Sequence, residues 1–218
     1  MKRRLPIFPL NTVFFPGAAL PLNIFEPRYR EMLRDCMAED RRFGVVLIKS
    51  GREAGRSAQP FRVGTVAHIT EVGAARRGAL PISVIGETRF RIQRLHRVRP
   101  YLTAEVEMIE DSPEEMASDE IIVAGYDATA RYIRTMFASQ GIFQADLEIP
   151  DDPLKMSYFM GMIAGSAPNR ALQTILETEN VADRIQAAIS LLEEETAGMA
   201  PVFMRSGPGA ERSLFSSN

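Results

Sequence analysis

The segment Leu5–Leu33 reads LPIFPLNTVFFPGAALPLNIFEPRYREML, and its pattern changes near its end. As far as Glu26, prolines at positions 6, 9, 16 and 21 interrupt the apolar residues, a pattern that favours short extended pieces separated by bends. After Pro27, apolar residues recur at the three- and four-residue spacing of an amphipathic helix, at Tyr29, Met32, Leu33, Cys36 and Met37. The segment therefore predicts strands followed directly by one helix.

The residues up to position 110 predict further strands. Phe43–Lys49 (FGVVLIK) is a continuous apolar run, which is typical of a buried strand. Other strands are expected at 61–72, 80–86, 89–98 and 101–109, with polar loops at 50–60 and 73–78. We therefore expect residues 1–110 to form a β-rich pseudo-barrel of two small antiparallel sheets with one inserted helix.

The second half of the chain has helix-start signals. A capping box begins at Ser112, with Pro113 and Glu115, and predicts a long helix to about Phe137. Three more helix starts are expected, at Asp152-Pro153, Pro168 and Asn180. We therefore expect a helical bundle over 111–196 and a Gly/Ser/Pro-rich tail over 197–218. The expected fold class is α+β.

The composition is that of a soluble globular protein. Of 218 residues, 45% are hydrophobic and 25% are charged. The net charge is only −2, so the chain as a whole has no positive charge that would attract nucleic acid or anionic lipid. Cys36 is the single cysteine, which excludes an intrachain disulfide. No apolar run approaches the ~20 residues that span a bilayer, and the proline-broken N-terminus does not resemble a signal peptide. We expect a cytoplasmic protein that binds no membrane.

The motifs of common enzymes are missing from the sequence. No GxxxxGK[ST] phosphate loop occurs, and none of the three lysines stands in a nucleophile motif. His68 and His96 are the only histidines, and with one cysteine they lack the spacing of a zinc site. We expect no catalytic residue, no cofactor and no metal.

The densest charge is a run of arginines at 89, 91, 94, 97 and 99. If Phe90 and Ile92 are buried, strand alternation places Arg89 and Arg91 on one outer face, together with Glu105 and Glu107 of the next strand. Those four residues are then ordinary cross-strand pairs. The alternation does not account for the rest of the run, which leaves a modest basic edge at Arg94, Arg97 and Arg99, with Arg76 and Arg77 as candidates to extend it.

Four segments carry a family resemblance. They are FRVGTVAHI at 61–69, IGETRFRI at 85–92, PYLTAEV at 100–106 and a helical ending with Leu176-Glu177, Val181 and Arg184. In this order, over about residues 5–196, the chain resembles the N-terminal substrate-binding domain of Lon proteases, and most of all its stand-alone bacterial form without the ATPase and peptidase domains. The resemblance implies a PUA-like fold for the β-rich part.

The resemblance also implies a function. It suggests a non-enzymatic module that binds unfolded or apolar polypeptide segments in an apolar groove between the two small sheets and the first helices, with a protease or a chaperone as a further candidate partner. Phe25, Arg28 and Tyr29 of the IFEPRY motif are the candidate contacts, although this motif could serve only to start the helix. The alternative is an RNA-binding module that uses the basic edge, and a steep salt dependence of binding would distinguish it.

Overall fold

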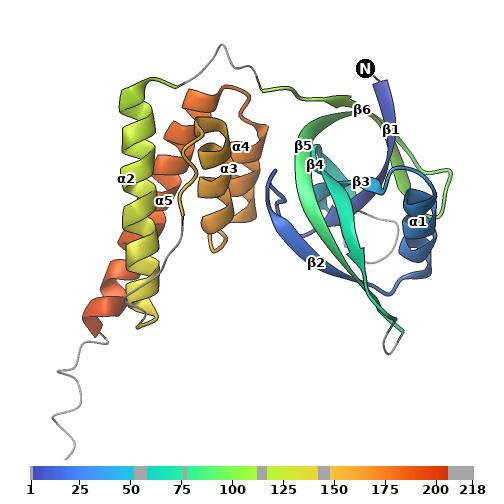
Figure 1. The fold of residues 1–218 in the computed structure, drawn as a ribbon, viewed down its shortest axis with the longest axis horizontal. Helices are drawn as coiled ribbons and strands as arrows, with labels where there is room; N and C mark the ends of the chain where they lie inside the picture. Colours follow the sequence, from blue (N-terminus) through green and yellow to red (C-terminus); the bar gives the residue numbers. More distant parts are fainter. Residues whose placement is uncertain (1, 52–57, 76–77, 112–116, 142–147, 206–218) are drawn as a thin grey trace, which may run out of the picture.

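The computed structural model describes residues 2–51, 58–75, 78–111, 117–141 and 148–205. A β-rich part comes first and a helical part follows it, side by side along the longest axis of the molecule (Figure 1). The first part contains β1 (Lys2–Leu10), β2 (Ala19–Ile24), α1 (Pro27–Ala38), β3 (Arg42–Ser50), β4 (Gln59–Val72), β5 (Leu80–His96) and β6 (Leu102–Met108). The second contains α2 (Asp119–Ser139), α3 (Pro153–Ile163), α4 (Asn169–Glu177) and α5 (Val181–Arg205). The α+β fold class is confirmed.

The strands form a single sheet that closes on itself. Its order is β2-β5-β4-β3-β1-β6, and β5 also pairs with β6. The predicted division into two antiparallel sheets is wrong, because β1 and β3 run parallel and all strands share one sheet. The two strands expected at 80–86 and 89–98 are one 17-residue strand, β5, whose start pairs with β2 and whose end pairs with β6. Gly86 does not end this strand, since its N–H donates to Ala18 O at 2.9 Å.

Two apolar cores fill the β-rich part. One is enclosed by the barrel and includes Leu5, Ile7, Val46, Val66, Phe90, Ile92, Ala104 and Val106. The other lies between the sheet and α1 and includes Phe8, Tyr29, Met32, Leu33, Cys36, Phe43 and Val45. Val45 and Val46 belong to different cores, so β3 is buried on both faces, as the continuous apolar run predicts.

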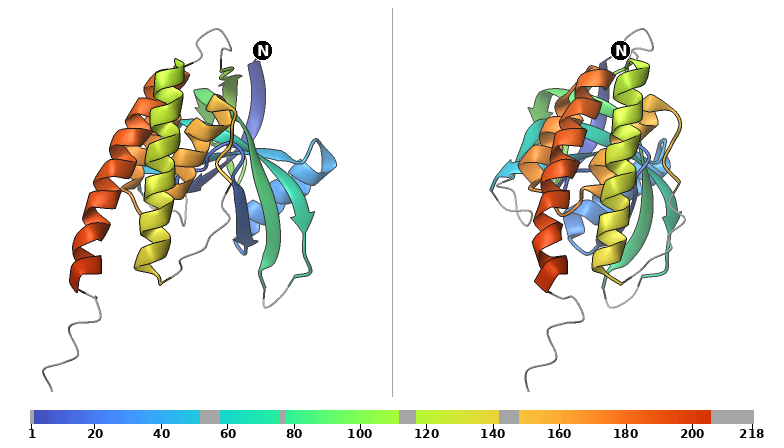
Figure 2. Two further views of the ribbon diagram at one scale, coloured as in Figure 1. Left: turned by 60° about the vertical axis from the view of Figure 1, so that its left-hand side comes forward. Right: turned by 90° about the vertical axis from the view of Figure 1, so that its left-hand side faces the viewer.

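The helical part begins as its caps predict at three places. Asp152 Oδ1 accepts from Lys155 N–H at 2.8 Å ahead of α3, and Asn180 Oδ1 accepts from Asp183 N–H at 3.0 Å ahead of α5. Pro168 stands directly before α4. The longer helices α2 and α5 lie side by side over the other two (Figure 2). The capping box at 112–116 lies outside the described residues, α2 begins at Asp119, and α5 continues past Thr196 to Arg205.

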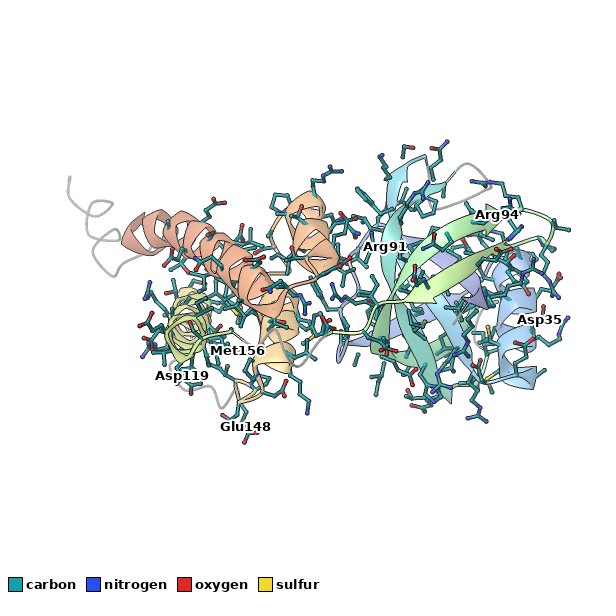
Figure 3. All side chains as sticks on the ribbon, turned by 90° about the horizontal axis from the view of Figure 1, so that it is seen from above. Asp35, Arg91, Arg94, Asp119, Glu148 and Met156 are labelled. Carbon is teal, nitrogen blue, oxygen red and sulfur yellow. The ribbon has the colours of Figure 1, made fainter. Side chains whose placement is uncertain are left out.

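The β5–β6 hairpin forms as predicted, with Arg89–Ile92 close to the 105–108 segment. Arg91 lies opposite Glu107, so these two residues are cross-strand neighbours. A bulge after Ile92 then shifts the register, so that Arg94 is opposite Glu105. Arg89 is not an exposed partner of a glutamate: it is 1% exposed, because the helical part covers that face of β5. Figure 3 shows Arg91 on the side of the barrel nearer the helices, whereas Arg94 lies farther along the hairpin.

Candidate functional site

The start of α1 holds the three residues that the sequence singles out. Pro27 begins the helix with its backbone angle already set. Phe25 is 65% exposed, whereas Tyr29 is 5% exposed and packs edge-on against Phe8 with ring centroids 4.3 Å apart. Arg28 lies over the Tyr29 ring, with Cζ 4.3 Å from its centroid, and donates from Nε to Glu26 Oε2 at 2.9 Å. Phe25 can therefore meet a ligand directly, and Tyr29 forms part of the floor beneath it.

A pocket of about 250 Å³ opens beside Phe25, where the ends of β1 and β2 meet the start of α1. We call it the Phe25 pocket, and it is lined by Phe8, Leu10, Leu22, Asn23, Ile24, Phe25, Glu26 and Tyr29. Six of these eight side chains are apolar or aromatic. The pocket is suited to an apolar side chain, with Asn23 and Glu26 as its polar members.

A second pocket, of about 280 Å³, lies at the other end of β2. We call it the Phe15 pocket; it joins the β1–β2 connection to the helical part and is lined by Thr12, Val13, Phe14, Phe15, Ala18, Ala19, Leu20, Gly161, Met162, Gly165 and Leu172. Helix α3 approaches the β1–β2 connection closely here, since a Cβ added at Gly161 would stand 2.5 Å from the Phe15 ring. Gly161 therefore allows α3 to pack directly on Phe15.

The strand between these two pockets has one open edge. β2 pairs with β5, and none of the strands in the described ranges pairs with its other side. Positions in an antiparallel pair alternate between those that bond the partner strand and those whose backbone faces away. Pro21 has no N–H, so it belongs to the outward-facing set, and Asn23 shares that set. Ala18 O accepts from Gly86 N–H of β5, so position 18 faces β5. Counting in alternation from position 18, Pro21 and Asn23 face away from β5.

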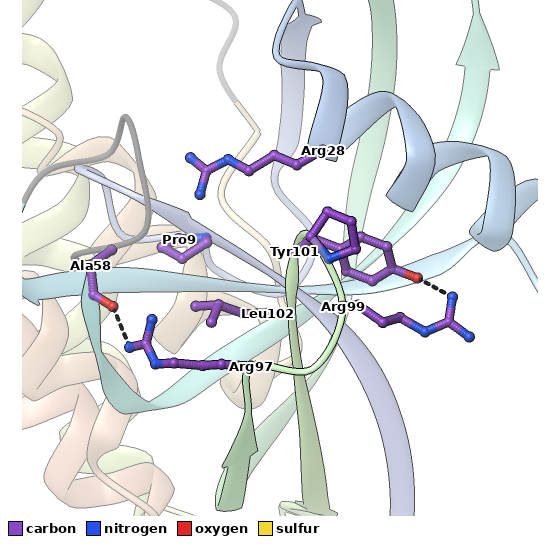
Figure 4. Close-up of a pocket in the computed structure, with 8 residues that line it drawn as sticks. Pro9, Arg28, Ala58, Arg97, Arg99, Tyr101 and Leu102 are labelled. Carbon is purple, nitrogen blue, oxygen red and sulfur yellow. Dashed lines mark hydrogen bonds between the residues drawn. The ribbon is translucent and has the colours of Figure 1, made fainter.

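A third pocket brings together arginines from the two competing hypotheses. It has a volume of about 140 Å³ and we call it the arginine pocket; its lining is Pro9, Arg28, Ala58, Arg97, Arg99, Pro100, Tyr101 and Leu102 (Figure 4). Arg28 is the candidate contact for polypeptide, whereas Arg97 and Arg99 belong to the predicted basic edge for RNA. The sequence does not bring them together, because their place around one pocket depends on β1 pairing with β6 beside α1.

Hydrogen bonds hold two of these arginines in place. Arg97 donates from Nη2 to Ala58 O at 3.0 Å. Arg99 donates from Nη1 to Asp35 Oδ2 at 2.5 Å, and the hydroxyl of Tyr101 donates to the same oxygen at 2.5 Å. Burial, helped by the bond to Asp35, raises the pKa of Tyr101 to about 12. Tyr101 is therefore a neutral wall of the pocket at physiological pH.

The remaining residues of the predicted basic edge do not join this pocket. Arg94 is exposed on β5 and lies opposite Glu105. Arg76 and Arg77 lie outside the described residues. The described arginines of the edge are thus divided: Arg97 and Arg99 line a pocket, whereas Arg94 lies on β5 opposite Glu105 of β6.

The two histidines each stand near one glutamate. His68 Nδ1 is 3.8 Å from Glu87 Oε1, and His96 Nε2 is 3.0 Å from Glu105 Oε1. Across the described ranges, no three His, Cys, Asp or Glu side chains gather in a way that could hold a metal ion.

Within the part of the chain that the structure describes, no helix combines the length and the apolar character needed to cross a lipid bilayer.

Comparison with known proteins places the chain among parts of Lon proteases. It is 28% identical to Lon protease 2 of Myxococcus xanthus and 27% identical to the Lon protease of Anaeromyxobacter dehalogenans, over 88% of this chain in both cases. Those alignments cover 24% and 23% of the two relatives, so the chain spans about a quarter of their length.

Solved structures give the same result for the fold. A Lon N-terminal domain protein from Xanthomonas campestris is 26% identical, with a TM-score of 0.66 over 86% of this chain and 98% of that one. The N-terminal domain of a Mycobacterium avium complex Lon protease, at 18% identity, shares the fold with a TM-score of 0.65 over 88% of this chain and 99% of that one. The family model of the ATP-dependent protease La (LON) substrate-binding domain matches residues 4–194, and the chain therefore belongs to this family of substrate-binding domains.

Proposed function

We propose that this protein binds unfolded or apolar segments of other polypeptides, and that it does so without a covalent step. The family is described as the substrate-binding domain of a protease, which is consistent with recognition of protein substrates. The observation that carries the proposal is the open edge of β2 with an apolar pocket at each end.

An extended peptide could add to β2 as a further strand. The six residues of β2 span about 20 Å at ~3.4 Å per residue, enough for a short peptide to reach both pockets. In this mode the backbone groups at the open edge bind the peptide backbone irrespective of sequence, and the pockets select apolar side chains. A protein that binds in this way can accept many different segments, because the backbone contacts do not depend on sequence and the pockets require only apolar side chains.

The binding should be weak and insensitive to salt. A flexible peptide loses ordering entropy when it binds, so we expect a Kd on the order of micromolar or weaker. Contacts between apolar groups do not release counterions, and moderate salt should leave the affinity almost unchanged. An RNA ligand would behave in the opposite way.

The proposal can be tested by ¹⁵N NMR titration of the full chain with an unstructured ten-residue apolar peptide. The amide of Asn23 should shift and become protected from hydrogen exchange, because it would donate to the added strand. Phe25→Ala should weaken binding several-fold. Tyr126→Ala is the matched control, since Tyr126 is an aromatic residue of α2 that is 47% exposed and remote from β2.

Three results would contradict this proposal. The peptide could fail to bind, or it could shift resonances of the helices while those of β2 stay still. The protein could also bind only RNA, with an affinity that falls steeply as salt is added. The last result would restore the basic edge as the functional surface.

A further inference from the structure

We infer that the site along β2 selects extended segments in which two apolar side chains stand four residues apart, and that such a segment adds antiparallel to β2. The inference rests on the proposed function for the class of ligand, a polypeptide, and adds the spacing of the residues that are recognised. The spacing follows from where the two pockets lie along the strand.

The side chains of β2 alternate between an inward face and an exposed face. The inward set is Leu20, Leu22 and Ile24, which pack against the core between the sheet and α1. The residues between them are exposed. A strand added beside β2 continues the same pleat, so every second side chain of that strand lies on the inward face.

Both pockets are lined by inward residues of β2. Leu20 lines the Phe15 pocket, whereas Leu22 and Ile24 line the Phe25 pocket, which continues past Ile24 to Tyr29. Side chains directly opposite one another in an antiparallel pair share a face. Ligand residues opposite Leu20 and Ile24 therefore point toward the two pockets. They are four residues apart, a distance of about 14 Å at ~3.4 Å per residue.

An odd spacing does not fit this arrangement. It places the second apolar side chain on the exposed face of β2, beside Ala19, Pro21 or Asn23. A helical ligand behaves differently, because residues three and four apart lie on the same face of a helix. The preferred spacing therefore distinguishes an added strand from a helix bound at the same place.

The backbone of the open edge sets a second requirement. Ala19, Pro21 and Asn23 face away from β5 and offer three carbonyl oxygens and, since proline has no N–H, two N–H groups. Antiparallel pairing is the more stable arrangement per residue. In that arrangement, the ligand residues opposite these three turn their backbone toward β2, whereas the residues with the apolar side chains turn theirs away. β2 contains no charged residue, so this recognition needs no charge on the ligand.

The test uses labelled twelve-residue peptides of serine and threonine with two leucines each, at positions 4 and 8, 4 and 7, or 4 and 9. Fluorescence anisotropy with the full chain measures the Kd of each. We expect the first peptide to bind about tenfold more tightly than the other two, the effect of burying one more leucine side chain. Phe25→Ala should remove most of this difference. Tyr126→Ala, on exposed α2 surface, should preserve it.

N-methylated peptides test the backbone contacts. N-methylation at peptide position 5 or 7 removes an N–H that would donate to Asn23 O or Pro21 O, and should weaken binding of the first peptide about tenfold. The matched control is N-methylation at position 6, where the N–H points away from β2, and it should change the Kd less than twofold. Equal effects at positions 5 and 6 would overturn the inference.

The outcomes separate this inference from the proposed function. If leucines three and four residues apart bind equally well, while Phe25→Ala weakens binding of the ten-residue apolar peptide, the inference is overturned and the proposed function stands. The same holds if only the fully apolar peptide binds, or if the spacing preference survives Phe25→Ala. If no peptide binds, both fail. Both also fail if the Asn23 amide is already protected from hydrogen exchange in the protein alone, because the edge would then be covered without a ligand.

Discussion

Arg89 of β5 and Arg184 of α5 donate to the same atom, Asp111 Oδ1, at 2.6 and 2.5 Å. Both arginine side chains are fully buried. Burial, and then the neighbouring Arg184, lower the pKa of Arg89. Two guanidinium groups share one carboxylate, so one positive charge is in excess. Carbonyl oxygens at and beyond the end of α4 stabilise it, because Arg89 Nη1 donates to Leu176 O at 2.8 Å and to Thr178 O at 2.7 Å. One carboxylate thus joins the barrel to the helices.

Asp111→Asn should destabilise the protein by about 3–5 kcal/mol, because it removes the anion between two buried cations. The control is Glu179→Gln, which breaks the more exposed ion pair with Arg91 across the same interface and should cost less than ~1 kcal/mol. Chemical denaturation of the full chain measures both. Equal losses of unfolding free energy in the two variants would show that the burial of Asp111 does not make its ion pairs more stabilising than the exposed one.

The stability of the wild-type protein should fall in acid more steeply than that of Asp111→Asn. Burial alone would raise the pKa of Asp111, but hydrogen bonds from Tyr158 and Arg184 outweigh burial and hold that pKa below its ordinary 3.8. The folded state therefore releases this proton more readily than the unfolded state. The stabilisation is complete above the ordinary pKa and is lost as the pH falls through the lowered one. Denaturation curves at several pH values from 7 downward would show the difference between the two proteins shrinking only below about pH 4.

Tyr29→Ala should cost about 3–5 kcal/mol, since it empties a buried site beside Phe8. Phe25→Ala removes an exposed ring and should change the free energy of unfolding by no more than ~0.5 kcal/mol. Thermal or urea unfolding distinguishes the two. If Phe25→Ala also unfolded the protein, the loss of peptide binding by that variant would no longer report on the pocket.

Gly161→Ala should be destabilising by ~1–3 kcal/mol, because its Cβ would stand 2.5 Å from the ring of Phe15 and force that ring to move. Gly165→Ala is the matched control, with its nearest neighbour at an ordinary 3.6 Å. In urea denaturation, Gly161→Ala should have a clearly lower free energy of unfolding than Gly165→Ala. The reverse order would mean that α3 can shift away from Phe15 at little cost.

The features that the sequence predicts well are local ones. Asp152 and Asn180 are caps whose partners lie three residues away, so the chain near each helix start contains the whole signal. The continuous apolar run of β3 likewise reports burial on both faces without any knowledge of its neighbours.

What the sequence does not predict depends on pairing between distant segments. Nothing near Gly86 shows that β5 continues past it to close the barrel against β6. Strand alternation places Arg89 and Arg91 on one face correctly, but only the docking of the helices makes one buried and leaves the other more exposed. The placement of Arg28 and Arg97 around one pocket has the same origin, because it follows from how α1 and the β5–β6 connection sit around β1.

Pro21 has a consequence for the solubility of the protein. An unpaired strand edge can join the same edge of a second molecule, and a continuous ladder of this kind is how many sheets begin to aggregate. Pro21 stands inside β2 on its open side and offers no N–H there, which leaves a gap in the row of donors. Two copies of this edge cannot form an unbroken ladder, whereas a flexible peptide can bend around the gap. A single proline thus discourages self-assembly at the very edge that is open to other chains.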